Sequence, residues 1–132
     1  ILTLEPPVTK SEKIYSALVP KDDEDGNEVE GIRGINIRVP VGTFTGWALR
    51  KEGSGRGDLS GLNGMFIPFK KTRAERKEAG DPRRSLQERY GSHEKYVAAV
   101  RKAAEALVAE GFLLPGDARS EMERAEKSSI LK

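Results

Sequence analysis

Residues 19–50 constrain the fold of this chain more than any other part of its sequence. Six acids surround the pair Gly26-Asn27, and because glycine adopts positive φ at little cost this acidic segment predicts a solvated hairpin tip. Residues 35–39 then alternate apolar and polar side chains, which predicts a half-buried strand. Trp47 follows as a large apolar anchor. The order of these signals predicts one compact β unit, and none of them indicates a catalytic site.

Three further stretches complete the N-terminal half. Residues 14–19 predict a strand that Pro20 ends. Residues 51–64 are rich in Gly, Ser and Asp without periodicity, and they predict an exposed loop. Residues 65–69 are strongly apolar, so we expect them to return the chain to the core.

The C-terminal half carries helix signals, and caps mark the helix boundaries. Thr72 with Glu75 has the spacing of a capping box, and Ser85 with Glu88 repeats it. Asp117, after Pro115 and Gly116, is expected to cap a final helix that frays near Ser128. Residues 70–132 are therefore predicted to be helical.

The longest predicted helix begins at Ser92 and is ended by Gly111. Its apolar stripe has helical spacing and consists of Tyr96, Val97, Val100, Ala104, Leu107 and Val108. Burial contributes about 25 cal/mol per Å² of apolar area, whereas an exposed ion pair contributes about a few tenths of a kcal/mol. We therefore expect packing, and not charge, to hold this helix.

These signals predict the α+β class, with a small, mainly antiparallel sheet in the N-terminal half packed by helices of the C-terminal half. The 132 residues suit a single core. They form either one domain or the C-terminal fragment of a longer protein, with a connector at 1–13, a β-rich part at 14–69 and a helical part at 70–132. With 36% hydrophobic and 33% charged residues, the chain is expected to be soluble and globular.

Composition excludes several classes of function. The formal net charge is +2, from 23 basic and 21 acidic residues, so no nucleic-acid partner is expected. The chain has no cysteine, which excludes disulfides, thiolate nucleophiles and thiolate metal sites. No apolar run approaches the roughly 20 residues that span a bilayer, so no membrane partner is expected. Location in the cell and oligomeric state stay open.

The acidic tip raises the question of a calcium site. Asp23, Asp25 and Asn27 stand at alternate positions, as the first ligands of an EF-hand loop do. That loop also needs a glycine at its sixth position and a glutamate at its twelfth, where this chain has Glu28 and Gly34. The pattern therefore favours a plain acidic turn, and we expect no metal.

Two other segments could be taken for catalytic motifs. His93 is the only histidine, and we expect a surface residue in the first turn of its helix; a small enzyme based on His93 is the weaker alternative. A serine elbow needs Gly-x-Ser-x-Gly, whereas residues 53–57 have Ser54 one place too early. We expect no activated hydroxyl in this chain, and that includes Ser54 and Ser60.

Phosphate and RNA sites are also disfavoured. The glycine-rich residues 53–57 lack the Gly-Lys-Ser or Gly-Lys-Thr ending of a phosphate-binding loop, so no cofactor is expected. A basic stretch includes Lys70, Lys71, Arg73, Arg76, Lys77, Arg83 and Arg84. Because acids are interleaved with these residues, a solvated helix face accounts for them better than an RNA groove.

Short motifs occur along about residues 20–117, and together they have a recognisable order. They are Val19-Pro20, Asp25-Gly26-Asn27-Glu28-Val29, Gly31-Ile32-Arg33, Pro40, Thr45-Gly46-Trp47, Phe66-Ile67-Pro68-Phe69, Thr72, Arg76, Gly80-Asp81-Pro82, Ser85, Glu88-Arg89-Tyr90-Gly91 and Leu113-Leu114-Pro115. In this combination the chain resembles the C-terminal part of bacterial alpha/beta hydrolase domain-containing proteins. Each motif alone is weak, and members of that family are much longer than this chain.

The resemblance implies an esterase-like parent hydrolase with Ser, His and acid machinery on an α/β sheet. Because this chain has no serine elbow, it implies a C-terminal portion that completes the core or lines the substrate cleft. The expected partners are the remainder of the parent hydrolase or a small ester substrate. No catalytic residue is carried over, and Asp25 and Asp81 stay open as acids that the segment donates. The alternative is a stand-alone binding module with a contact patch around Trp47 and Phe66.

Overall fold

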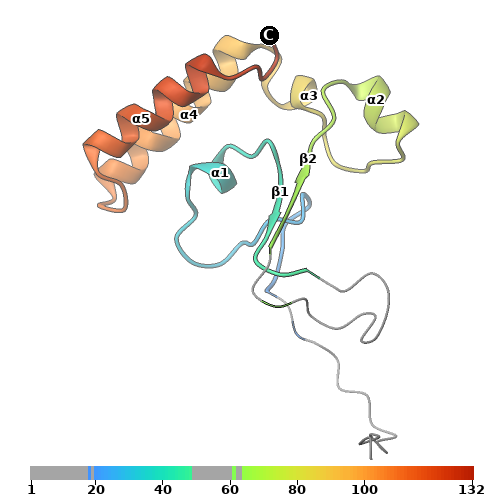
Figure 1. The fold of residues 1–132 in the computed structure, drawn as a ribbon, viewed down its shortest axis with the longest axis horizontal. Helices are drawn as coiled ribbons and strands as arrows, with labels where there is room; N and C mark the ends of the chain where they lie inside the picture. Colours follow the sequence, from blue (N-terminus) through green and yellow to red (C-terminus); the bar gives the residue numbers. More distant parts are fainter. Residues whose placement is uncertain (1–17, 19, 49–60, 62–63) are drawn as a thin grey trace, which may run out of the picture.

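The computed structural model describes residues 18, 20–48, 61 and 64–132. The elements in chain order are α1 (Ile35–Arg38), β1 (Gly42–Thr45), β2 (Met65–Pro68), α2 (Arg73–Glu78), α3 (Leu86–Tyr90), α4 (His93–Ala109) and α5 (Pro115–Lys127). An antiparallel pair of strands followed by helices confirms the α+β class (Figure 1). The predicted connector at 1–13, nearly all of the strand at 14–19 and nearly all of the loop at 51–64 lie outside the described residues.

The sheet consists of β1 and β2 in an antiparallel register that places Gly42 opposite Pro68 and Phe44 opposite Phe66. The two phenyl rings pack across the strands, with centroids 4.6 Å apart. Glycine is required at position 42, because a Cβ there would lie 2.5 Å from Cε2 of Phe66 and 2.6 Å from the carbonyl oxygen of Ile67. The absence of a side chain at Gly42 therefore lets the Phe66 ring lie over β1.

The hydrophobic core lies against a hairpin of two long helices, α4 and α5, which run side by side (Figure 1). Its buried residues include Val100, Ala103, Ala104 and Leu107 of α4, Ala118 and Ala125 of α5, and Val39 after α1. The alanines let the two helix backbones approach closely, and the predicted stripe of α4 is confirmed at Val100, Ala104 and Leu107.

The predicted strand at 35–39 is wrong, because this segment forms the short helix α1. The backbone N–H of Arg38 donates to the carbonyl of Gly34 at 3.0 Å, and that of Val39 donates to Ile35 at 2.8 Å. Ile35 and Val39 are four residues apart, a spacing that places both on one face of a strand and also on one face of a helix. Contact with the core around Val100 selects the helix.

The capping boxes are confirmed. Thr72 accepts from the N–H of Glu75 at 3.2 Å, and Ser85 accepts from the N–H of Glu88 at 3.3 Å. Ser92 caps α4, as predicted. These contacts are local, so three or four consecutive residues are enough to specify them.

Two expectations about apolar and cap residues are wrong. Residues 65–69 do not all return to the core, since only Phe69 is buried and every residue of β2 is exposed. Asp117 does not cap the last helix: α5 begins at Pro115, whose missing N–H costs nothing at this position, and Asp117 lies within the first turn. No helix in the described part of the chain is long and apolar enough to cross a membrane.

Candidate functional site

The acidic segment folds into a tight turn that Asp23 organises. Its Oδ1 accepts the backbone N–H groups of Asp25 and Asn27, both at 3.0 Å. Gly26 has a φ of +77°, the conformation that the Gly-Asn pair predicts. The turn is therefore confirmed, but it is solvated only in part. Lys21, Asp22, Glu24 and Glu30 are exposed, whereas Asp25 is 6% exposed and Asn27 is fully buried.

Asn27 is buried because its side chain completes the outer edge of β1. Its Nδ2 donates to the carbonyl of Gly42 at 3.2 Å, and its Oδ1 accepts the N–H of Phe44 at 2.8 Å. The carboxamide of Asn27 thus bonds one C=O and one N–H of β1, as the backbone of a neighbouring strand would. At this point a side chain, and not a strand, bonds the edge of β1.

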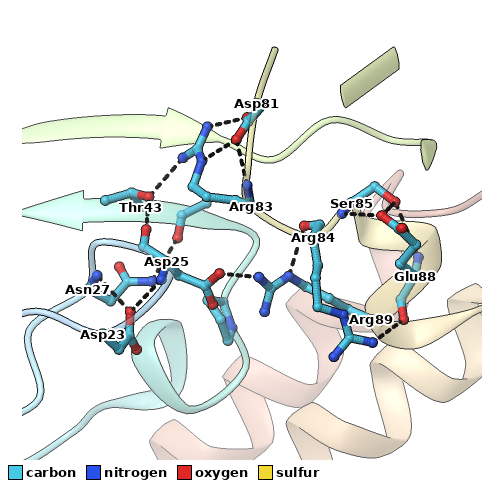
Figure 2. A network of polar contacts seen from close by, with 12 residues as sticks. Asp23, Asp25, Asn27, Thr43, Asp81, Arg83, Arg84, Ser85, Glu88 and Arg89 are labelled. Atoms are coloured by element: carbon cyan, nitrogen blue, oxygen red, sulfur yellow. Dashed lines mark hydrogen bonds and ion pairs between the residues drawn. The ribbon is translucent and has the colours of Figure 1, made fainter. Parts of the chain in front are cut away.

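Asp25 joins this turn to α3 through an ion pair with Arg89. The two side chains are 7% and 12% exposed, so the pair is largely withdrawn from water. The carbonyl of Asp25 also accepts the hydroxyl of Thr43 on β1. A single residue therefore links the turn, the sheet and α3, as Figure 2 shows.

The ring of Phe69 contacts two arginines of the same network. The guanidinium carbons of Arg89 and Arg83 lie 4.3 and 5.2 Å from the ring centroid. Arg83 forms a bidentate pair with Asp81 at 2.6 and 2.9 Å, and it donates to Thr43 Oγ1 at 2.8 Å (Figure 2). The hydrogen bonds from Arg83 hold the pKa of the Asp81 carboxyl below its usual value.

A second bidentate pair joins α2 to α3. Arg76 donates to both carboxylate oxygens of Glu88, at 2.6 and 2.9 Å. The same carboxylate accepts the N–H and the hydroxyl of Ser85, at 2.9 and 2.7 Å. The hydrogen bonds from Arg76, followed by those from Ser85, lower the pKa of Glu88 strongly. Arg76 and Arg83 are therefore paired, and only part of the predicted basic stretch is a solvated face.

The residues considered for catalysis do not come together. His93 begins α4, and its Nδ1 and Nε2 lie 2.8 and 3.2 Å from the carbonyl oxygens of Ile130 and Glu126. Among the described residues no serine hydroxyl is hydrogen-bonded to this ring, and Ser54 and Ser60 lie outside them. We expected His93 to be a surface residue. It is partly buried instead, because its ring packs against the segment that follows α5.

The carboxylates considered as ligands or acids have other partners. Asp23 accepts two amides and pairs with Arg33 at 3.4 Å, while Asp25 and Asp81 each face an arginine. In the part of the chain that the structure describes, no three His, Asp or Glu residues are grouped as metal ligands. These carboxylates are therefore structural in this arrangement.

An open apolar groove lies between α1, β1 and the connection from α4 to α5, with a volume of about 380 Å³. Its apolar lining consists of Ile32, Ile35, Ile37, Phe44, Leu107, Phe112 and Leu113, and Asn36 and Glu121 are its polar members. A second hollow of about 310 Å³ shares Ile32, Ile37 and Phe44 with it. This apolar groove has the size and lining of a site for a small apolar group, and its lining residues include no serine and no histidine.

The family of the chain follows from comparison with known proteins. The model of the family described as alpha/beta hydrolase domain matches residues 3–123. The chain belongs to this alpha/beta hydrolase domain family. No curated protein and no solved structure matches it significantly. The family resemblance of its motifs is confirmed, while the place of this hydrolase-family chain within a longer protein stays a prediction.

Several residues that carry the family resemblance meet in the polar network around Phe69. They are Asp25, Asn27, Phe69, Asp81, Ser85, Glu88 and Arg89. Arg83 and Thr43 belong to the same network; the basic stretch predicts a solvated face for Arg83, and no sequence signal pointed to Thr43. The separation between Asp25 and Arg89 is 64 residues, which is beyond the reach of any local pattern.

We expect Asp25→Asn to destabilise the fold, because Arg89 would keep a largely buried charge without a carboxylate. Breaking one partner of a buried pair costs about 3–5 kcal/mol. The matched control is Glu126→Gln, in a pair with Arg101 whose side chains are 51% and 53% exposed, where about 0.5 kcal/mol or less is expected. Urea unfolding followed by Trp47 fluorescence measures both, and equal losses would contradict the structural role of Asp25.

Glu88 is expected to make stability depend on acid pH. Because its folded pKa is depressed, its contribution is present above the unfolded value of about 4.3 and is lost as pH falls toward the folded pKa. Glu88→Gln should lower stability at neutral pH and flatten its decline between about pH 5 and pH 2. Glu105→Gln, on the exposed face of α4, is the control. Urea denaturation across this pH range tests it, and parallel curves for wild type and Glu88→Gln would refute it.

Proposed function

We propose that this chain is the C-terminal portion of an esterase-like hydrolase, where it lines the substrate cleft without supplying the nucleophile. The observation that carries the proposal is the apolar groove, which has room for a ligand and has no serine or histidine among its lining residues. Membership of the alpha/beta hydrolase domain family supports the reaction class. The serine, the histidine and the acid would come from the remainder of the protein.

The chemistry of the groove suits the acyl or aromatic part of a small ester. Side chains from α1, β1 and the segment after α4 contribute to it, so a ligand would be held by elements that the core already fixes. Binding by such a surface comes from burial of apolar area and leaves the ester bond to other groups. Exposed Ile32 and Leu114 at or near the groove offer apolar area to the remainder of the hydrolase.

We expect the isolated chain to hydrolyse nitrophenyl esters no faster than buffer. Among the described residues no serine hydroxyl is hydrogen-bonded to His93, and Ser85, whose hydroxyl donates to the Glu88 carboxylate, is fully buried. Release of nitrophenolate over a series of acyl lengths measures this. A serine esterase of known activity serves as the positive control. Activity that a serine-directed inhibitor abolishes would show that the chain carries its own nucleophile and would end the proposal.

Phe112→Ala should weaken the binding of a short fatty acid to the chain. The phenyl ring lines the groove, and its loss is expected to cost about 1 kcal/mol, which is about fivefold in Kd. Leu114→Ala removes another exposed apolar side chain that does not line the groove, so it should leave Kd unchanged. Isothermal titration calorimetry with butyrate and octanoate compares the variants. Equal effects at the two positions would remove the groove as the ligand site.

A second candidate function is a stand-alone interaction module. The observation that favours it is a run of exposed apolar residues on β2, where Met65, Phe66 and Ile67 are 40%, 51% and 42% exposed. Trp47, the other residue of the predicted contact patch, is partly buried. The patch is therefore centred on β2.

A further inference from the structure

We propose that the outer edge of β2 is a docking surface for a second copy of this chain, which pairs with it as an antiparallel strand centred on Phe66. The inference deepens the interaction-module function and does not rest on the hydrolase role. A negative result here would leave the proposed substrate cleft untouched.

The register of the sheet determines which backbone groups of β2 face outward. In an antiparallel ladder, residues alternate between bonding the partner strand and pointing away from it. The N–H of Phe69 donates to Val41 at 3.0 Å, so Ile67 and Met65 also direct their backbone groups toward β1. The N–H and C=O of Phe66 therefore point away from β1, as does the C=O of Pro68.

The two edges of the sheet differ in how they are finished. Asn27 bonds the outward groups of Gly42 and Phe44 on β1. Among the described residues, no hydrogen bond reaches the outward groups of Phe66, and every residue of β2 is exposed. An exposed apolar strand edge of this kind is a template for another strand.

A twofold axis at Phe66 pairs the outer edge of β2 with the same edge of a second copy. The N–H of Phe66 in each copy then reaches the C=O of Phe66 in the other. Residues 64 and 68 then lie opposite each other, so the outward C=O of Pro68 in each copy faces Gly64 of the other. Pro68 has no N–H to offer, which limits the pairing to a short stretch and disfavours other registers.

The side chains are self-complementary in this register. On one face, Phe66 of each copy lies beside the other and extends the Phe44–Phe66 pair, whose centroids are 4.6 Å apart, into a row of rings. On the other face, Met65 of one copy lies beside Ile67 of the other. Residues 64–69 carry no charge, so no like charges oppose each other across the axis. These features favour a second copy over an unrelated strand.

Backbone amide exchange of the unaltered chain provides the first test. Within one copy the N–H of Phe66 points away from β1, and no described residue bonds it, while the N–H of Ile67 faces β1. Nuclear magnetic resonance should therefore show exchange at Phe66 that slows as protein concentration rises, and exchange at Ile67 that does not change in the same way. Sedimentation velocity on the same samples should show a monomer converting to a dimer.

Phe66→Pro provides the second test, with Phe66→Leu as its control. Both variants remove the ring, but only proline removes the outward N–H, and the ladder bonds to β1 do not use that group. The proline variant should raise the dimer dissociation constant about tenfold or more above that of the leucine variant. Far-ultraviolet circular dichroism checks that both remain folded.

A concentration-dependent dimer with a protected Phe66 amide supports the proposal. A monomer at all concentrations would overturn it, and so would a dimer that Phe66→Pro leaves intact. Constant protection of the Phe66 amide in a monomer would also overturn it, because the edge would then be covered within one chain. If the proline variant fails to fold, the exchange experiment on the unaltered chain decides.

Discussion

The ion pair between Asp25 and Arg89 connects the parts of this small fold that are distant in sequence. It brings the acidic turn against α3, and through the carbonyl of Asp25 it also holds Thr43 of β1. Arg89 stacks on Phe69, so an aromatic ring covers the pair from one side. A charge pair withdrawn from water is stable only if its hydrogen bonds are complete, which ties the position of each member to the others.

The same requirement gives the carboxylates of this polar network partners within the fold. An acid or base acts through an atom that can reach a substrate, and Asp25, Asp81 and Glu88 each direct their carboxylate to an arginine. Each of these negative charges is paired with an arginine, and the pairs hold elements of the fold together. The apolar groove has the opposite character, with open space and few polar atoms. The polar network and the apolar groove are thus located in different parts of this hydrolase-family chain.

The features that could be predicted from the sequence are those that neighbouring residues determine. The capping boxes at Thr72 and Ser85 and the turn at Gly26 follow from local geometry, and the structure has all three. The strand predicted at 35–39 was wrong. The spacing of Ile35 and Val39 suits the two-residue period of a strand and also the 3.6-residue period of a helix, and only packing against α4 distinguishes the two. The apolar groove was not predicted, since its walls come from segments about 70 residues apart.

The two strands of the sheet differ in how their outward backbone N–H and C=O groups are hydrogen-bonded. Two strands alone are marginal in water, because their outer backbone groups gain nothing from folding. On β1 the side chain of Asn27 bonds those groups, and the buried turn that carries it is fixed by Asp25 and Arg89. The closed edge therefore depends on the ion pair. β2 has no equivalent residue in the described part of the chain, and its apolar side chains face solvent on both sides. Another backbone can bond these outward groups as Asn27 does on β1, and it also covers the apolar side chains, which a single carboxamide would leave exposed.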